Sequence, residues 1–319
     1  MPSDLSAWRA RIAEACGRIY ALAQQTPIAL VEDDQRLGST RALLKLEHLQ
    51  RTGSFKLRGA TNKVLSLSPE EAANGVITSS TGNHAVGVAT AARDHGIDAE
   101  VLVSWQVAPT KLRLIEACGA RIHHSGDSPV EAELAARAAA AASGKTYISP
   151  YNDPHVIAGQ GTIGIELVQQ VGSIDAIYIA VGGGGLIGGI GAYMKSVSPQ
   201  TEIVGCWPEN SRVMYECLQA GEVIDFPEHV TLSESTAGGV EPESITFELC
   251  QKVIDRSVLV SEPEIMDAMR WAHRRGWKVE GAAGVAIAAF FKEASRQYGR
   301  SAVIISCGGN PSPEVLSQL

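Results

Sequence analysis

Lys56 is the side chain best placed in this sequence for covalent amine chemistry. It follows Gly53-Ser54-Phe55, where the Gly-Ser pair predicts a turn and Ser54 is a candidate cap for a helix that begins directly afterwards. Lys56 would then lie in the first helical turn, where the positive end of the helix dipole disfavours an ammonium group. A lysine that forms a Schiff base needs such a neutral amine. Taken alone, a lysine in this position is more often a solvated surface residue, and the segments below favour the Schiff-base role.

Small hydroxyl, glycine and amide residues join a predicted strand at 76–78 to the helix that follows it. These residues are Ser80, Thr81, Gly82, Asn83 and His84. Such a turn leaves backbone N–H groups free at a helix start, and these groups together with the helix dipole favour a carboxylate or phosphate. The alternatives are a capped helix entrance without a ligand and a structural role for the histidine.

Four consecutive glycines follow the predicted strand 176–181. They are Gly182, Gly183, Gly184 and Gly185, and Leu186 comes after them. Because glycine has no Cβ, backbone N–H groups can converge on a phosphate at the start of a helix. The Lys-Ser/Thr pair of a P-loop is absent, and so is the dinucleotide fingerprint with an acidic residue placed for a ribose. The segment therefore predicts a site for one phosphate monoester, and a tight turn without a ligand is the alternative.

Cys307 lies directly beyond the predicted strand 302–305, within the segment Ser306-Cys307-Gly308-Gly309-Asn310. A short polar side chain at the carboxyl end of a strand faces the crevice where α/β sheets bind ligands. No two cysteines form a C-x-x-C pair, and none has a zinc-site spacing with histidine. We therefore interpret the other cysteines as reduced core thiols. They are Cys16, Cys118, Cys206, Cys217 and Cys250.

The elements that must position these segments alternate along the chain. The predicted strands span residues 43–46, 76–78, 100–103, 121–123, 176–181, 202–206 and 302–305. The predicted helices span residues 85–92, 109–117, 130–142, 163–171 and 263–274. This alternation predicts parallel strands with crossover helices, hence an α/β fold. No Pro/Ser-rich linker divides the chain, so a chain with two domains must cross between them more than once.

The composition narrows the possible partners. The 319 residues include 27 Lys and Arg and 35 Asp and Glu, for a net charge of −8, and 5% are aromatic. An acidic balance with few aromatics argues against nucleic acids and anionic membrane surfaces as partners. No apolar run reaches the ~18 residues of a membrane span, and the first 16 residues lack the apolar core of a signal peptide. We therefore expect a cytoplasmic protein.

In their order and spacing, the four segments resemble the pyridoxal-phosphate enzymes of fold type II, the tryptophan-synthase β-like family. The similarity is greatest to the serine/threonine dehydratase and serine racemase branch. Further matching stretches are Thr26-Pro27, Lys45-Leu46-Glu47, Ala158-Gly159-Gln160-Gly161-Thr162 and Glu280-Gly281-Ala282-Ala283-Gly284.

The resemblance implies two three-layer α/β domains with open twisted sheets and with the cofactor in the cleft between the domains. Residues 1–51 and 149–319 would form the large domain, and residues 52–148 would form a small mobile domain. Members of this family are commonly homodimers.

The resemblance also implies a role for each predicted position. Lys56 would bind pyridoxal 5'-phosphate covalently and later take the α-proton of an amino-acid substrate, and Phe55 would pack against the cofactor. Asn83 would hydrogen-bond the phenolic oxygen of the cofactor, and Cys307 would face its pyridine nitrogen. The four glycines and Leu186 would hold the phosphate. The turn of residues 80–84 would hold the substrate carboxylate.

Cys307 bears on the reaction type. Relatives have serine or cysteine at this position, and neither supplies a full counter-charge, so the ring would stabilise a long-lived carbanion only weakly. Prompt loss of a β-hydroxyl group is therefore favoured over transamination. The resemblance thus implies a lyase that converts L-serine or L-threonine into a 2-oxo acid and ammonia.

Several departures from the family pattern leave alternatives open. Thr81 stands where serine racemases have a serine base, so racemisation is a possible side activity. Trp207 and Val213 occupy positions that are acidic in metal-dependent relatives, so we expect no metal. Gly238 replaces an aspartate, as in dehydratases of hydroxyectoine breakdown. Residues 127–131 carry no basic side chain, which favours serine, threonine or a bulkier neutral β-hydroxy amino acid such as phenylserine over hydroxyaspartate. A β-replacement synthase or a non-catalytic binding protein would use the same fold.

Overall fold

Two sheets organise the computed structural model, which describes residues 5–32, 34–105, 107 and 109–319. In the larger sheet, β1 is antiparallel to β2 and the other neighbours are parallel. In spatial order its six strands are β1 (Ile28–Leu30), β2 (Arg41–Lys45), β10 (Ser301–Ile305), β7 (Ala176–Ala180), β8 (Glu202–Pro208) and β9 (Arg256–Val260). The smaller sheet is parallel throughout. Its four strands are β5 (Arg121–His124), β4 (Ala99–Val103), β3 (Val76–Ser79) and β6 (Thr146–Tyr147).

Helices occupy most of the connections between these strands. The helices of the first half are α1 (Leu5–Ile19), α2 (Lys56–Val64), α3 (Pro69–Asn74), α4 (Asn83–Asp94), α5 (Pro109–Ala117) and α6 (Pro129–Ser143). Those of the second half are α7 (Pro154–Val171), α8 (Gly185–Val197), α9 (Val213–Ala220), α10 (Ile245–Val253), α11 (Glu262–His273), α12 (Gly281–Lys292) and α13 (Pro313–Leu316). Single 3-10 turns span Gln35–Leu37, Glu47–Leu49 and Ala294–Gln297.

Each sheet lies between two layers of helices. In the larger sheet, α12 packs against β7, β8, β9 and β10, and α8 packs against β7 and β8. In the smaller sheet, Val76 packs in the cluster that includes α4, whereas its neighbour Ile77 packs with Ala136 and Ala140 of α6. Successive side chains of a strand point to opposite faces, so α4 and α6 cover the two faces of this sheet. The predicted three-layer α/β fold is therefore confirmed.

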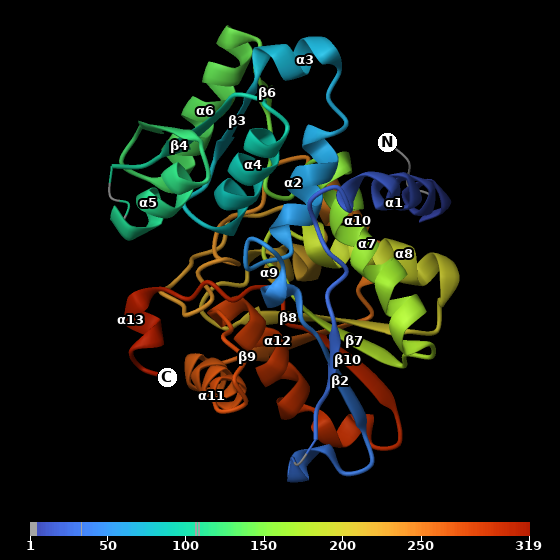
Figure 1. Cartoon of the computed structure of the whole chain (residues 1–319). Helices are drawn as coiled ribbons and strands as arrows, with labels where there is room; N and C mark the ends of the chain where they lie inside the picture. The colour runs from blue at the N-terminus through green and yellow to red at the C-terminus, as the bar shows by residue number, and fades with distance from the viewer. Residues whose placement is uncertain (1–4, 33, 106, 108) are drawn as a thin grey trace.

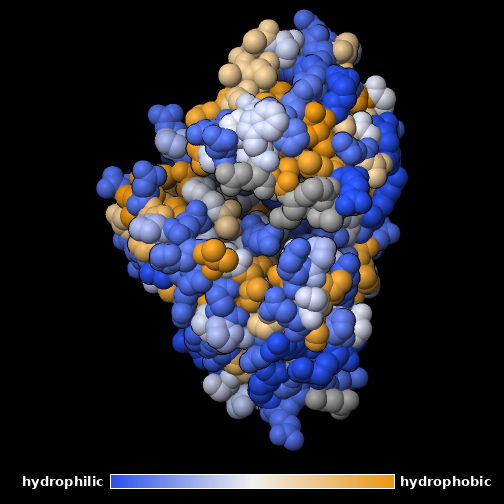
Figure 2. Space-filling model, turned by 90° about the vertical axis from the view of Figure 1, so that its left-hand side faces the viewer, coloured by the Kyte–Doolittle hydropathy of each residue, from blue (hydrophilic) through white to orange (hydrophobic). Residues whose placement is uncertain are grey.

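The two sheets lie in different parts of the molecule. Figure 1 shows the smaller sheet with α3 to α6 in the upper part and the larger sheet in the lower part. Helix α7 packs against α1, α2 and α8 where the two parts meet. Figure 2 turns the left side of Figure 1 toward the viewer and shows a hollow near the middle of that face. The division into domains at residues 51/52 and 148/149, and the mobility of the smaller one, stay predictions.

All seven predicted strands are confirmed, with ends that differ by up to two residues. The sequence analysis missed β1 and β6, which have three and two residues and are too short to show a periodicity. It also missed β9, a half-buried strand at the edge of the larger sheet. The predicted helix at 163–171 begins earlier, at Pro154, because the Asp153 side chain caps it by accepting the N–H groups of residues 155 and 156.

The predicted cap at Ser54 is wrong. The residue that precedes α2 is Phe55, which has helical dihedral angles and makes no side-chain cap hydrogen bond. Ser54 instead forms an isolated antiparallel bridge with Gly308, and its hydroxyl is buried without a partner. Tertiary pairing with the segment after β10 therefore determines the conformation at this position. Within the part of the chain that the structure describes, no helix is long and apolar enough to cross a membrane.

Candidate active site

Lys56 is the first residue of α2, as predicted from the sequence. Its Nζ donates a hydrogen bond of 2.8 Å to the carbonyl oxygen of Pro150. Burial lowers the pKa of the Lys56 amine to about 8, against the opposing influence of Cys307 and Glu280. The physical cause is removal of the ammonium group from water, whereas the sequence argument had invoked the helix dipole. Near pH 8 a large fraction of this amine is neutral and able to attack an aldehyde.

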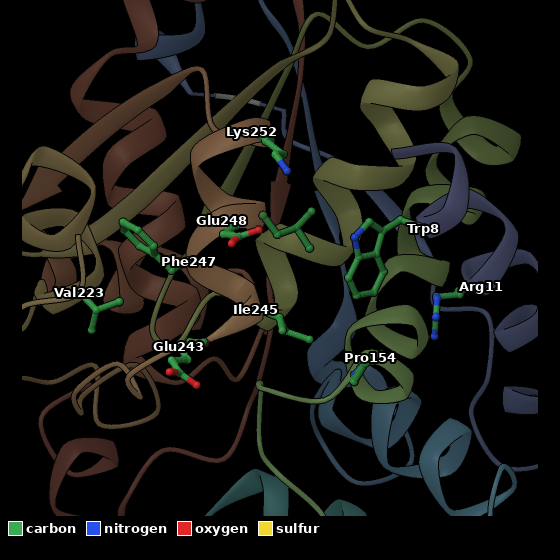
Figure 3. A pocket seen from close by; sticks show the side chains of 11 residues that line it. Trp8, Arg11, Pro154, Val223, Glu243, Ile245, Phe247, Glu248 and Lys252 are labelled. Carbon is green, nitrogen blue, oxygen red and sulfur yellow. The ribbon is translucent and has the colours of Figure 1, made fainter. Parts of the chain in front are cut away.

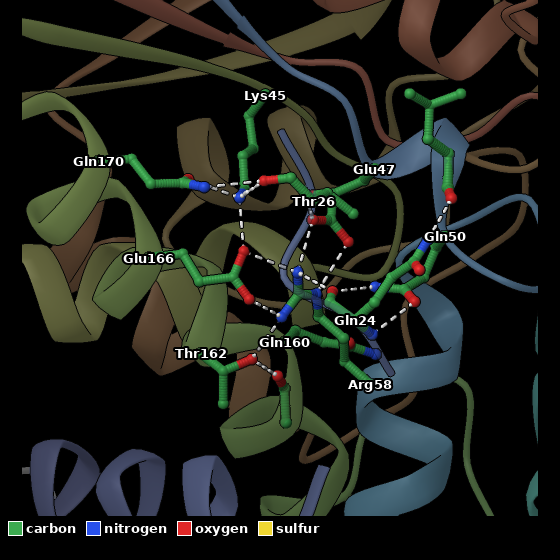
Figure 4. Close-up of polar contacts among 12 residues, drawn as sticks. Gln24, Thr26, Lys45, Glu47, Gln50, Arg58, Gln160, Thr162, Glu166 and Gln170 are labelled. Atoms are coloured by element: carbon green, nitrogen blue, oxygen red, sulfur yellow. Dashed lines mark hydrogen bonds and ion pairs between the residues drawn. The ribbon is translucent and has the colours of Figure 1, made fainter. Parts of the chain in front are cut away.

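Arg58 anchors the helix that carries Lys56 (Figure 4). Its guanidinium donates to Glu47 at 2.7 and 2.8 Å and to Glu166 at 2.6 and 2.9 Å. Lys45 forms a further ion pair with Glu166, and all four side chains are fully buried. Two cations thus balance two carboxylates, which buried charges require. The cluster joins β2, α2 and α7 and fixes the first turn of α2.

Residues 53–55, which precede Lys56, lie directly beside Cys307 and Gly309. The N–H of Phe55 donates to the carbonyl oxygen of Cys307 at 3.1 Å, and the N–H of Gly309 donates to the carbonyl oxygen of Gly53 at 2.8 Å. Cys307 is 3% exposed, and burial raises the pKa of its thiol well above the usual value. Its side chain is therefore a neutral thiol. The structure thus brings together two segments that lie about 250 residues apart in the sequence.

Asn83 begins α4 and meets a carboxylate that the sequence analysis did not assign. Its Nδ2 donates to both oxygens of Glu280 at 2.9 Å, and its Oδ1 accepts a hydrogen bond of 2.7 Å from Asn310. Glu280 also accepts a 2.7 Å hydrogen bond from Ser235 Oγ, and its residue is 5% exposed. The sequence feature that could have indicated Glu280 is its position in the stretch 280–284, which matches the family. The resemblance attached no role to that stretch.

The turn before α4 presents backbone groups more than side chains. Gly82 caps α4 without a side-chain hydrogen bond, and its N–H donates to Ser80 Oγ at 3.2 Å. Ser80 and Thr81 are half-buried. The His84 ring is buried against the carbonyl oxygen of Ile148 at 3.0 Å, and burial lowers its pKa to about 3. The imidazole is therefore neutral and bonded through Nε2, whereas its buried Nδ1 has no partner among the described residues. The N–H groups of the first turn of α4 could bind an anion.

The glycine segment leads directly into α8. Gly184 has φ +87° and caps the helix without a side-chain hydrogen bond. A Cβ placed on Gly183 would lie 2.4 Å from the Tyr151 ring, and one on Gly182 would lie 2.8 Å from the carbonyl oxygen of Thr236. Close packing against the protein therefore requires glycine at these positions. The Leu186 side chain belongs to the core, so only its backbone could contact a ligand.

Together these features fit the pyridoxal phosphate that the resemblance implies. Lys56 bonds to Pro150, and the next residue, Tyr151, packs on Gly183, so the amine and the glycine segment share one supporting segment. The start of α8 has no side-chain cap, so its backbone N–H groups could bind a phosphate, and the Lys56 amine can bind an aldehyde. Cys307 lies against Phe55, next to Lys56, and Asn83 contacts Asn310 from the same segment that follows β10, so both could hold the cofactor ring.

A separate cavity of about 290 Å³ lies between α1 and α10 and contains none of the predicted site residues (Figure 3). Trp8 and Leu249 line it, together with Ser244. Ser244 Oγ lies 2.7 Å from the hydroxyl of Thr246, which donates a 2.6 Å hydrogen bond to the carbonyl oxygen of Gly183. The cavity therefore lies behind the glycine segment, on the other side of the first turn of α10.

Comparisons with known proteins show the family of this chain. The family described as "Pyridoxal-phosphate dependent enzyme" matches residues 19–308. An L-threonine ammonia-lyase of Thermotoga maritima is 38% identical over 86% of this chain and 69% of its own length. A catabolic L-threonine dehydratase of Escherichia coli is 36% identical over 86% of this chain and 84% of its own.

Solved structures give the same result. The processed form of threonine deaminase isoform 2 from Solanum lycopersicum has a TM-score of 0.93 and 33% identity, covering 99% of this chain and 93% of its own. Maize serine racemase has a TM-score of 0.91 and 30% identity, covering 97% and 95%. The resemblance seen in the four sequence segments is therefore confirmed, and the chain belongs to the pyridoxal-phosphate dependent enzyme family.

Proposed function

We propose that this protein is an ammonia-lyase that converts L-threonine and L-serine into the corresponding 2-oxo acid and ammonia. The observation that carries the proposal is the Lys56 amine, whose pKa burial lowers to about 8, bonded to Pro150 beside the glycine segment. Relatives described as threonine ammonia-lyase and threonine dehydratase support this choice of substrate.

The residues of this chain divide the chemistry among them. Pyridoxal phosphate, when bound, would supply a ring that accepts electron density from the substrate α-carbon. Lys56 would hold the cofactor covalently and, once freed by the substrate amine, would remove the α-proton. Backbone N–H groups of residues 182–186 would hold the phosphate, and those of residues 80–84 would hold the substrate carboxylate. The Asn83 amide would donate to the phenolic oxygen, with Phe55 packed beside the ring.

Cys307 would favour elimination. Because burial raises its thiol pKa, it stays neutral and gives the pyridine nitrogen no counter-charge. Negative charge at the α-carbon is then best relieved by expelling the β-hydroxyl group. The substrate loses its β-hydroxyl and one α-proton as water, water then replaces the nitrogen, and the products are a 2-oxo acid and ammonia.

Replacing Lys56 by alanine tests the proposal. We expect the K56A variant to lose covalent cofactor capture and ammonia release from L-threonine. The K63A variant is the matched control, because Lys63 lies on the same helix and its amine forms an ion pair with Asp153. Borohydride reduction and peptide mapping should place the cofactor on residue 56. Turnover by K56A at the wild-type rate would overturn the assignment.

A substrate panel then decides between the remaining activities. We expect L-threonine and L-serine to yield more 2-oxo acid than hydroxyaspartate, phenylserine or a β-hydroxy amino acid derived from hydroxyectoine. A β-replacement synthase would instead need an added thiol for turnover. Racemisation is the second candidate, because Thr81 places a half-buried hydroxyl in the turn before α4 and maize serine racemase is 30% identical. D-serine formed from L-serine, measured beside ammonia, would reveal it.

We further propose that residues 52–148 form a domain that closes over the bound substrate and excludes water. We also propose that the protein is a cytoplasmic homodimer. Light scattering on the purified protein should then give twice the chain mass of 33.7 kDa. A value equal to the chain mass would contradict the dimer.

A further inference from the structure

Glu241 connects the segment between α9 and α10, in which it lies, with residues 151–152 and with α6. It has no role in the site described above. It lies in the segment between α9 and α10, with 21% of its side chain exposed. Its backbone N–H donates a 3.0 Å hydrogen bond to the Tyr151 hydroxyl. Its carboxylate accepts a 3.0 Å hydrogen bond from Asn152 Nδ2 and forms a 2.7 Å ion pair with Arg137 of α6.

The segment that Glu241 holds, residues 149–152, also supports the site. The carbonyl oxygen of Pro150 accepts the hydrogen bond of the Lys56 amine, and the Tyr151 ring fills the space beside Gly183. Asn152 Oδ1 accepts the N–H of Ile245 at the start of α10. A shift of residues 149–152 would therefore move both the Pro150 carbonyl oxygen that accepts from Lys56 and the Tyr151 ring that packs on Gly183.

Arg137 extends this arrangement to the upper part of the molecule (Figure 1). It lies on α6, which packs against the smaller sheet, and its guanidinium stacks on Tyr147 at 4.3 Å. Two carboxylates share its Nη2, Glu133 at 2.8 Å and Glu241 at 2.7 Å. Glu133 lies four residues earlier on the same helix, whereas Glu241 comes from a distant segment. Only the pair with Glu241 depends on where α6 lies relative to the rest of the molecule.

We propose that Glu241 is a positioning residue, which aligns residues 149–152 with the site when α6 is in place beside it. The inference rests on the proposed function. Among the described residues, Glu241 has no hydrogen bond or ion pair to Lys56 or the glycine segment, so it acts through Tyr151 and Asn152, which follow the Pro150 carbonyl in the chain. When Arg137 pairs with Glu241, α6 contacts the same carboxylate that accepts a hydrogen bond from Asn152, so the position of α6 affects the position of residues 149–152. Substrate binding and the alignment of the amine are thereby coupled.

Comparison of Glu241→Gln with Glu133→Gln tests this coupling. Both substitutions remove one carboxylate from the same Arg137 nitrogen and keep the side-chain shape. For E241Q we expect KM for L-threonine to rise about 3- to 20-fold, with kcat within about twofold, because a charge-assisted contact between separate elements is lost. For E133Q we expect both constants to stay within about twofold. Added salt should raise KM of the wild type more than KM of E241Q, because salt screens partly exposed ion pairs.

Hydrogen exchange of the cofactor-free protein supplies a readout that does not depend on turnover. We expect faster exchange in residues 146–152 and in α6 for E241Q but not for E133Q. The effects of R137Q and E241Q on KM should be less than additive in the double variant R137Q/E241Q, because the interaction between the two side chains is lost only once. If E241Q does not fold, R137Q compared with E133Q carries the same test.

Equal KM values and equal exchange in E241Q and E133Q would overturn the inference. Additive effects in the double variant would do so as well. Failure of the proposed function would look different, since turnover would then persist in K56A while the exchange difference between E241Q and E133Q stayed in place.

Discussion

Replacing Arg58 by methionine should strongly destabilise the fold. The substitution leaves Glu47 and Glu166, both fully buried, with only Lys45 to balance them. Breaking a buried ion pair by removing one partner costs about 3–5 kcal/mol, because an uncompensated charge stays inside the protein. For a chain of 319 residues this corresponds to a decrease in Tm of about 4–8 °C. Urea unfolding and calorimetry of the cofactor-free protein would measure both quantities.

Arg270 provides the control for this experiment. Its ion pair with Asp267 is 3.8 Å long, and the two side chains are 44% and 80% exposed. Arg270→Met should therefore change the free energy of unfolding by less than about 1 kcal/mol. If R58M does not fold, the milder variant E166Q should show a smaller loss in the same direction. A free energy of unfolding for R58M within 1 kcal/mol of that of R270M would refute the reasoning.

Two further predictions concern the site. Competitive amine labelling of the cofactor-free protein should show a midpoint near pH 8 for Lys56, because burial lowers its pKa to about 8 from 10.5 and only the neutral amine reacts; a midpoint near 10.5 would contradict the burial argument. Gly183→Ala should weaken binding of pyridoxal phosphate about tenfold or more, because the new Cβ would lie 2.4 Å from the Tyr151 ring. Gly17→Ala, which meets nothing within 4 Å, should leave the dissociation constant measured by equilibrium dialysis unchanged.

Local patterns predicted much of the fold. The strand that ends at Ala180 is an unbroken apolar run because both of its faces are buried, and the glycines that follow end it clearly. The position of Lys56 in a first helical turn was also predictable from local sequence, because the turn signal at Gly53-Ser54 lies next to the helix in the chain. Strands β1 and β6 were not readable, because two or three residues show no periodicity.

The partners of the site residues were not predictable in this way. Glu280 and Asn310 meet Asn83 from 197 and 227 residues away, and nothing near Asn83 in the sequence indicates either contact. Ser54 has the residue type of a helix cap, yet its pairing with Gly308 decides its conformation. The His84 ring, which could have faced a ligand, is bonded to Ile148 instead.

The sequence by itself determined the fold class, the family and the segments that could hold a cofactor, because turns, glycines and helix starts are short-range features of the chain. Tertiary structure alone decided which amine is buried enough to be neutral near pH 8, which carboxylates balance Arg58, and which residue ties α6 to the Lys56 acceptor. The physical reason is that desolvation and ion pairing depend on distances in space, and the fold sets those distances between residues far apart in the chain.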